Sequence, residues 1–451
     1  MLSAPALPAL LSRPLAIGVA EYRQRRDVLM SQLPSNSAVV LPGAGLMTRS
    51  RDSEFAFRQN SDFYYLTGIK EPDALLVLLP GRTEGESVVF CLDRDPTMEV
   101  WTGRRLGAAG VVAEHGIDQA FENAERDERL SGLLAGRELL YLPLDSAEAV
   151  SIAEDALHAA HAGLRHGRPP LKGWLDINPL IHEMRLVKSD AEIALLRHAA
   201  AISAGAHRRA MQVSRPGLSE FQLQAELEHE FVWQGASGPA YSTIVGSGAN
   251  ACVLHYIENS APLCEGDLVL IDAGAEFDLY AGDITRTFPV AGRFSDAQRA
   301  LYQVVLEAQE HAVDAIKPGA TLADIHQGVV RDLTAGLIEL GLLEGDVQAR
   351  IDDDSYRRFY LHSTSHWLGL DVHDVGTYRL DEKTPRSLVA GMVLTVEPGL
   401  YIPCDDDIPV TYQGIGIRIE DNVVVTHDSH EVLTADAPKQ IAEIEALMAK
   451  K

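Results

Sequence analysis

Residues 266–274 read GDLVLIDAG, and residues 391–399 read GMVLTVEPG. Each string is an apolar run that one carboxylate interrupts shortly before a glycine, Asp272 in the first string and Glu397 in the second. Apolar runs bounded by turn residues are typical of buried strands. The agreement between the two strings indicates an internal duplication, although strings this short also agree by chance.

The segments upstream of these strands also correspond. Residues 215–219 (RPGLS) and residues 317–321 (KPGAT) each lead into a helical pattern. A capping box at residues 189–192 (SDAE) starts an earlier helix that runs towards Met211. Each half therefore reads as helices followed by a strand that carries one acid, and two such halves would bring their acids towards one centre.

A second strand, residues 279–288, follows the first acidic strand after a short turn. A hairpin centred between Phe277 and Asp278 would place Asp272 directly opposite Asp283, roughly 5 Å apart at Cβ. Facing carboxylates repel, and a buried carboxylate is costly when unpaired, so this arrangement predicts a cation between them. The alternative is that one acid is exposed and the other pairs with a nearby base.

A fourth acid, Glu420, follows in residues 414–421, which read GIGIRIED. We expect it to face Glu397 across a longer hairpin with three aspartates, residues 405–407, near its tip. Arg418 lies on the same strand face as Glu420 and can orient or neutralise a nearby carboxylate. The alternative is a pair of solvated acids on an edge strand.

Three histidines lie within residues 362–373, which read HSTSHWLGLDVH, in a chain that holds 16 histidines. A single histidine is more often structural than a ligand, but a cluster in a chain with these acids favours metal binding. Spacing alone does not choose among His362, His366 and His373. Four carboxylates and one imidazole suit Mn²⁺ or a similar divalent ion, and two such ions roughly 3.5 Å apart would activate a bridging hydroxide.

The N-terminal part of the chain alternates short apolar runs with helical patterns, which indicates an α/β domain. A linker is expected near residues 168–170 (RPP). The predicted strands are residues 37–41, 75–79, 88–92 and 139–142, and the predicted helices are residues 20–33 and 145–162.

Composition excludes several classes of function. The net charge of −26 would repel a nucleic-acid backbone at long range. Because the four cysteines form no CxxC pair, we expect reduced thiols and a cytoplasmic protein. No apolar run has the roughly 18 to 20 residues of a membrane helix. Residues 1–15 contain prolines and lack an early positive charge, so they are interpreted as a surface arm rather than a signal peptide.

Taken together, the motifs LIDAG, GDITRTFPV, SHWLGLDVHDVG, VLTVEPGLYI and GIGIRIED resemble those of the bacterial aminopeptidase P (Xaa-Pro aminopeptidase) family of pita-bread metallopeptidases, family M24. Residues 57–68, FRQNSDFYYLTG, are similar to the N-terminal domain of that family. The resemblance implies an α/β N-terminal domain over residues 1–172. It also implies an α+β pita-bread catalytic domain with an internal pseudo-twofold duplication over residues 173–451.

The resemblance also implies roles for individual residues. Asp272 would hold one metal ion, Asp283 and Glu420 would bridge two ions, and His366 and Glu397 would complete the set. Glu397 is further expected to shuttle a proton between the attacking water and the proline nitrogen.

Other residues are implied to act on the substrate. His255 and His373 correspond to histidines that steady the substrate and the tetrahedral intermediate. His362 corresponds to a histidine near the proline pocket. The remaining residues of the implied substrate-binding set are Tyr401, Arg418 and Trp101.

The function implied is a dinuclear-metal aminopeptidase that releases the N-terminal residue from peptides with proline in the second position. Mn²⁺ is the expected metal, and a homodimer or homotetramer is the expected assembly. A prolidase, which cuts Xaa-Pro dipeptides, has the same ligands and stays an alternative. A non-catalytic peptide-binding relative, or metal-free creatinase-type chemistry, predicts lost ligands, and none is lost. Residues 378–390 differ from the usual loop at the substrate entrance, which leaves the preferred peptide length open.

Overall fold

The computed structural model describes residues 9–449, which divide into two compact units. The N-terminal unit is Ala16–Arg185, and the C-terminal unit contains residues 186–449 together with residues 9–15. The predicted boundary after residue 172 differs from this division. The reason is that β8 (Gly173–Asp176) pairs in parallel with β7 (Leu139–Leu142) and so continues the N-terminal sheet beyond the expected linker.

The predicted surface arm belongs to the C-terminal unit where it is described. Residues 1–8 of the arm lie outside the described residues. Residues 9–15 are mostly exposed, and the amide of Leu11 donates to Oε1 of Gln234 at 3.0 Å. Within residues 9–449, none of the helices has the length and apolarity needed to cross a membrane.

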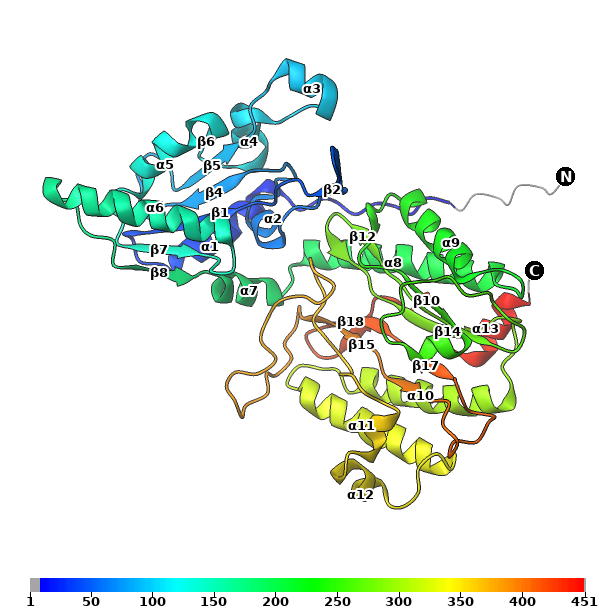
Figure 1. The fold of residues 1–451 in the computed structure, drawn as a ribbon. Helices are drawn as coiled ribbons and strands as arrows, with labels where there is room; N and C mark the ends of the chain where they lie inside the picture. Colours follow the sequence, from blue (N-terminus) through cyan, green and yellow to red (C-terminus); the bar gives the residue numbers. More distant parts are fainter. Residues whose placement is uncertain (1–8, 450–451) are drawn as a thin grey trace. The chain divides into compact units, whose positions relative to one another are not determined.

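A six-stranded mixed sheet in the order β6-β5-β4-β1-β7-β8 forms the centre of the N-terminal unit (Figure 1). Its central strands are buried throughout, as their continuous apolar runs predict. Leu130 and Leu134 of α5 and Ile152 of α6 pack against it, and the predicted α/β domain is thus confirmed. The other elements of this unit are α1 (Val19–Ser31), β1 (Ser37–Pro42), β2 (Thr48–Ser50), β3 (Ser53–Glu54), α2 (Ser61–Thr67), β4 (Leu75–Leu78), β5 (Ser87–Cys91), α3 (Pro96–Thr102), α4 (Gly107–His115), β6 (Gln119–Glu122), η1 (Asn123–Glu125), α5 (Arg126–Leu134), α6 (Ala147–Gly163), η2 (Leu164–His166) and α7 (Asn178–Leu186).

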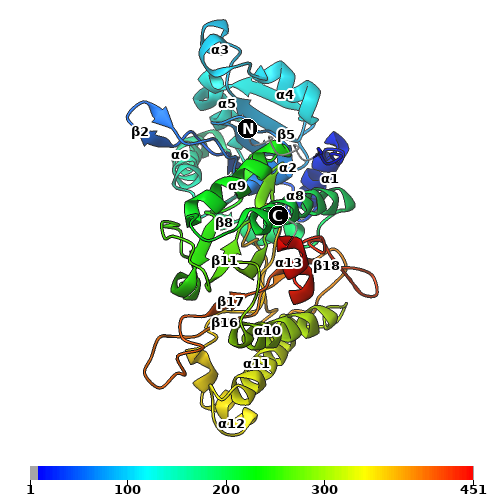
Figure 2. The same cartoon turned by 90° about the vertical axis from the view of Figure 1, so that its right-hand side faces the viewer.

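The C-terminal unit is built from two similar halves, each a helix pair followed by antiparallel strands. The helices of the first half lie on one side of the strands and those of the second half on the other (Figures 1 and 2). The first half contains α8 (Asp190–Val213), α9 (Glu220–Trp233), β9 (Gly238–Pro239), β10 (Ile244–Ser247), η3 (Gly248–Cys252), β11 (Leu268–Asp272), β12 (Ala275–Phe277), β13 (Tyr280–Ala281) and β14 (Thr285–Pro289). The second half contains α10 (Asp296–Asp314), α11 (Leu322–Glu339), α12 (Val347–Asp352), η4 (Ser355–Arg358), β15 (Val393–Val396), β16 (Gly399–Tyr401), β17 (Gly416–Arg418), β18 (Asp421–Val425) and β19 (His430–Val432), and α13 (Ile441–Met448) ends the described chain.

The two halves correspond in detail. Ser219 caps α9 and forms an isolated bridge with Pro262, just before β11. Thr321 caps α11 and forms the equivalent bridge with Ser387, just before β15. In both halves, therefore, the start of the second helix is tied to the approach of the acidic strand. The duplication expected from the short strings is present in the backbone.

Candidate metal centre

The first pair of acids lies on the hairpin of β11 and β14, but not in the predicted register. Asp272 pairs with Thr285 rather than with Asp283, so the predicted register is wrong by two residues. The turn is centred on Asp278 and Leu279, whose φ values of 52° and 67° are those of a two-residue primed turn. A shift of two residues keeps the same strand face because side chains alternate with period two. Asp283 is therefore diagonal to Asp272 and still on its side of the sheet.

Tyr241 joins the two aspartates, although it lies upstream of both strands. Its hydroxyl is 2.6 Å from Oδ1 of Asp272 and 2.5 Å from Oδ1 of Asp283. Burial and the neighbouring carboxylates raise the pKa of this hydroxyl well above its usual value. Tyr241 thus stays protonated and brings the two carboxylates to one point.

The second pair of acids is in the predicted register. Val396 pairs with Asp421 and Gly399 pairs with Arg418, so Glu397 and Glu420 face each other between these two ladders. Glu420 is buried, and Oε2 accepts a hydrogen bond of 2.6 Å from the hydroxyl of Thr285. That contact joins the second hairpin to the first.

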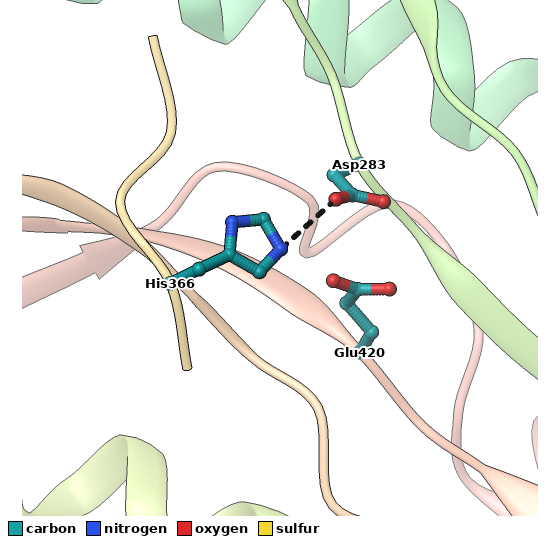
Figure 3. A group of neighbouring side chains, drawn as sticks. All are labelled: Asp283, His366 and Glu420. Atoms are coloured by element: carbon teal, nitrogen blue, oxygen red, sulfur yellow. Dashed lines mark ion pairs between the residues drawn. The ribbon is translucent and has the colours of Figure 1, made fainter. Parts of the chain in front are cut away.

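His366 comes to the acids because its segment runs beside β15. The amide of Thr395 donates to the carbonyl of His366 at 2.9 Å, and Trp367 forms a bridge with Leu394. Figure 3 shows the His366 ring and the carboxylates of Asp283 and Glu420 directed towards one another. Their ligand atoms all lie within 4.8 Å of one another, and Nε2 of His366 is 3.4 Å from Oδ2 of Asp283.

The remaining predicted residues of the C-terminal unit surround the same point. Nη2 of Arg418 is 2.7 Å from Oδ2 of Asp272, and Nη1 donates to the hydroxyl of Tyr401 at 2.8 Å. That hydroxyl is also 2.8 Å from Nε2 of His362. The rings of His366 and His373 are in edge contact, with centroids 4.4 Å apart.

A cavity of about 770 Å³ opens onto these groups. His255, His362 and His373 line it together with all the predicted metal ligands. The segment that departs from the usual loop contributes Tyr378, Arg379 and Pro385 to its wall. Trp101 is 81% exposed on α3 of the N-terminal unit, and its approach to the substrate stays a prediction.

The carboxylates of Asp283, Glu397 and Glu420 lie close together and largely buried, which opposes the ionisation of all three at once. Burial raises the pKa of Glu397 to about 7, although His366 and Arg418 oppose this rise. Burial and the neighbouring acids raise the pKa of Glu420 well above its usual value, and burial also raises the pKa of Asp283. Burial alone would lower the pKa of His366, but the Asp283 and Glu397 carboxylates raise it to about 9.

These residues fit a divalent metal. Hard oxygen donors with one imidazole are the ligand chemistry of Mn²⁺ and similar ions, and a bound cation would offset the mutual repulsion of the acids. Nδ1 of His366 donates to the carbonyl of Trp367 at 2.9 Å, which directs Nε2 towards the acids. Such a backbone partner is what a ligating histidine needs to fix its ring.

Several residues of the site were not predicted from the sequence. Tyr241 and Thr285 contact the acids, as described above. The side chain of Asn422 holds the backbone of Asp283 through two hydrogen bonds, one of 3.0 Å from the amide of Asp283 and one of 2.5 Å to its carbonyl. Thr285 and Asn422 stand within two residues of predicted ligands on strands, and that spacing is the one signal that could have indicated them.

The duplicated fold and its acid–histidine cluster are those of a metal-dependent enzyme. The chain matches the model of metallopeptidase family M24 over residues 194–427 and that of the aminopeptidase P N-terminal domain over residues 22–141. It is 48% identical over 430 residues to the Xaa-Pro aminopeptidase of Escherichia coli strain K12, covering 95% of this chain and 97% of that protein. The chain therefore belongs to metallopeptidase family M24.

Solved structures agree with this assignment. An aminopeptidase from Pseudomonas aeruginosa superposes with a TM-score of 0.94 at 49% identity, over 96% of this chain and 98% of that chain. A zinc-substituted E. coli aminopeptidase P in complex with product superposes with a TM-score of 0.93 at 47% identity, over 96% and 99% of the two chains. The fold is the pita-bread fold with an aminopeptidase P type of N-terminal domain.

Proposed function

We propose that this protein is an Xaa-Pro aminopeptidase, which removes the N-terminal residue from peptides whose second residue is proline. The observation that carries the proposal is the convergence of Asp283, His366 and Glu420 in a cavity of about 770 Å³. The curated relatives with high identity over nearly the whole chain are named for this activity. The site and the relatives thus support the same reaction.

Two divalent ions, with Mn²⁺ as the expected metal, are part of the proposal. Asp272 would hold one ion, Asp283 and Glu420 would bridge both ions, and His366 and Glu397 would complete the coordination. When bound, such ions supply Lewis acidity towards the substrate carbonyl and lower the pKa of water. The mutual repulsion of the Glu397 and Glu420 carboxylates supports the presence of bound cations at this site.

The protein's own side chains would position the peptide and move the proton. Hydrolysis breaks the bond between the carbonyl carbon and the proline nitrogen, and that nitrogen must receive a proton. The Glu397 carboxylate lines the cavity, with Oε1 3.6 Å from Nε2 of His366, and there it can take a proton from water and return it to the leaving nitrogen. His255 and His373 would steady the substrate and the developing negative charge on its carbonyl oxygen.

The cavity wall suits a proline ring. Ile244, Leu254 and Val372 line it with apolar surface, and His362 adds an imidazole held by Tyr401. Burial, followed by the nearby Arg418 charge, lowers the pKa of His362 to about 4, so its ring is neutral at neutral pH. A neutral ring beside aliphatic side chains can pack against proline without a desolvation cost for charge.

The test compares a dipeptide with a longer peptide. The protein is purified and loaded with Mn²⁺. Its kcat/KM for release of the first residue from an Xaa-Pro-Xaa tripeptide is expected to be higher than its kcat/KM for cleavage of an Xaa-Pro dipeptide. A strong preference for the dipeptide would identify a prolidase, which has the same ligands. An Xaa-Ala-Xaa tripeptide is the matched control, because it keeps the length and removes only the proline ring.

A cytoplasmic location and assembly into homodimers or homotetramers stay predictions from the sequence and the family. Size-exclusion chromatography with light scattering would test the assembly.

A further inference from the structure

The loop of residues 366–374 carries His366 at its start and His373 near its end. The loop is closed by its own backbone, since the amide of Asp374 donates to the carbonyl of Trp367 at 2.9 Å. Within it, the amide of Gly369 donates to the carbonyl of Asp371 at 3.1 Å. The two histidines are therefore held in contact by a folded-back segment and not by a helix or strand.

The carbonyl of Trp367 has a second partner. Nδ1 of His366 lies 2.9 Å from it, and a carbonyl can only accept, so Nδ1 must carry the hydrogen. That hydrogen bond leaves Nε2 of His366 directed at Asp283, 3.4 Å away. The direction of the His366 ring thus depends on where one carbonyl is held, and Asp374 holds that carbonyl through its amide.

A buried ion pair stands behind the loop. Nζ of Lys188 is 2.9 Å from Oδ2 of Asp374, and each side chain is only 1% exposed. Oδ1 of Asp374 accepts from the amide of Asp371 at 3.4 Å. At Gly369, a Cβ atom would lie 2.2 Å from Oδ2 of Asp374 and 3.0 Å from Cε of Lys188, so the pair occupies the space inside the loop.

Lys188 also connects this loop to the strand that carries a second predicted ligand. Its amide donates to the carbonyl of Gly391 at 2.9 Å, two residues before β15, and Glu397 directly follows the end of that strand. Burying two charges gains little stability over an apolar pair of the same size, because desolvation offsets their attraction. A gain in stability therefore explains the buried pair of Lys188 and Asp374 poorly. Their contacts with the loop and with the residues before β15 explain it better, because those contacts can position the loop.

We propose that Lys188 and Asp374 are positioning residues that hold the 366–374 loop against β15 and so fix the direction of the His366 and His373 rings. The inference rests on the proposed function, because it treats His366 as a metal ligand. Neither residue contacts the reacting atoms. Their effect passes through the carbonyl of Trp367 and the backbone of the loop.

The experiment measures the Kd of metal-free protein for Mn²⁺ by isothermal titration calorimetry. Asp374→Asn keeps the shape of the side chain and removes its charge, and it is expected to raise the Kd by about 10- to 100-fold, as loss of support behind a ligand does. Asp62→Asn is the matched control, because Asp62 is paired with Arg185 at 2.7 Å in the N-terminal unit. It is expected to lower the unfolding midpoint and leave the Kd unchanged. An unchanged Kd for Asp374→Asn would overturn the proposal.

The double variant Lys188→Met/Asp374→Leu separates positioning from folding stability. It removes both charges, so neither partner is left buried without the other. Its unfolding midpoint is therefore expected to be higher than that of Asp374→Asn and closer to that of the unmodified chain. Its Kd for Mn²⁺ is expected to stay raised, because the link between the loop and Lys188 is gone. Recovery of midpoint and affinity together would show a merely structural role. Failure of the unmodified chain to bind Mn²⁺ would instead contradict the proposed function.

Discussion

The two acidic hairpins of the C-terminal unit reach the same centre in different ways. In the second hairpin Glu397 and Glu420 are directly opposite, in register with Val396 and Asp421. In the first hairpin Asp272 is opposite Thr285, and Asp283 is diagonal to it. The hydroxyl of Tyr241, which lies outside the hairpin, joins the diagonal pair of Asp272 and Asp283. The facing pair is brought together by the register of its strands alone.

The support behind the hairpins differs as well. The second hairpin is supported by Arg286, which extends from β14 of the first hairpin: its Nη2 pairs with Asp421 at 2.6 Å, and its Nη1 donates to the carbonyl of Glu420. Behind the first hairpin, Nε2 of His207 on α8 bonds to the carbonyl of Ala273 at 2.9 Å. One acidic strand is thus supported by buried charges and the other by a neutral imidazole. Duplicated halves can keep the position of their ligands while the support behind those ligands diverges.

The largest expected effect is the loss of an acid from the diagonal pair. Asp283 is a proposed metal ligand, so Asp283→Ala should cost on the order of 5 kcal/mol of transition-state stabilisation, roughly four decades in kcat/KM. The measurement is kcat/KM on an Xaa-Pro tripeptide, with metal content determined in parallel. Asp267→Asn, at the start of the same hairpin, is the control and should retain activity. Metal-dependent activity that survives Asp283→Ala would refute the ligand set.

The second effect concerns the charged support of the facing pair. Arg286→Met leaves the Asp421 carboxylate buried with one of its cations gone, which should lower the free energy of unfolding by about 4 kcal/mol. Urea unfolding of the metal-free protein measures it. Arg197→Met breaks an exposed pair with Glu431 and should cost less than about 1 kcal/mol. Equal losses of unfolding free energy in the two variants would show that the buried pair contributes no more to stability than the exposed pair.

The third effect is the pH dependence that His207 contributes behind the first hairpin. Burial lowers the pKa of His207 from 6.5 to about 4. Between these values the unfolded chain binds a proton that the native state does not, so stability is lost as the pH falls from about 6.5 to about 4. A shift of this size corresponds to about 3 kcal/mol at 1.36 kcal/mol per unit. Asp421, whose pKa is lowered below 3.8 by Arg286 and Lys439 against the effect of burial, stays ionised over this range.

Urea unfolding of the unmodified chain and of His207→Gln at pH 7 and pH 4.5 isolates this term, because all other buried groups are common to both proteins. The unmodified chain should lose more stability on acidification than the variant. Equal losses would mean that His207 is not held neutral by the fold.

The smallest effect concerns the contact between the hairpins. Thr285→Val removes the hydrogen bond of 2.6 Å to Glu420, which should weaken Mn²⁺ binding by about 2 kcal/mol, or about 30-fold in Kd. Thr334→Val is the matched control, since the Thr334 hydroxyl donates to the carbonyl of Val330 within its own helix. If both variants bind Mn²⁺ like the unmodified chain, the contact between the hairpins does not contribute to metal affinity.

The comparison of the hairpins also shows what the sequence could predict. The acids were found because single carboxylates stand out in apolar strands, and the alternation of side chains brought them together even where the register was wrong. The register of the first hairpin was missed because its turn uses Asp278 and Leu279, neither of which is the glycine that positive φ values favour.

Other parts of the site depend on contacts far apart in the sequence. Spacing could not choose among the three histidines, because the pairing of the His366 carbonyl with Thr395 becomes visible only when β15 is placed. Tyr241 and the pair of Lys188 with Asp374 have no local pattern at all. Propensity and periodicity predict helices and strands from neighbouring residues. The roles of these residues depend instead on tertiary contacts with residues far away in the sequence.

The most direct test of the two-metal site is a titration of metal-free protein with Mn²⁺ while the hydrolysis of an Xaa-Pro tripeptide is followed. The acids and His366 are proposed to hold two ions that act together, so activity should rise to a plateau at about two equivalents of Mn²⁺ per chain. A plateau at one equivalent, or full activity in the presence of a chelator, would contradict the two-metal site.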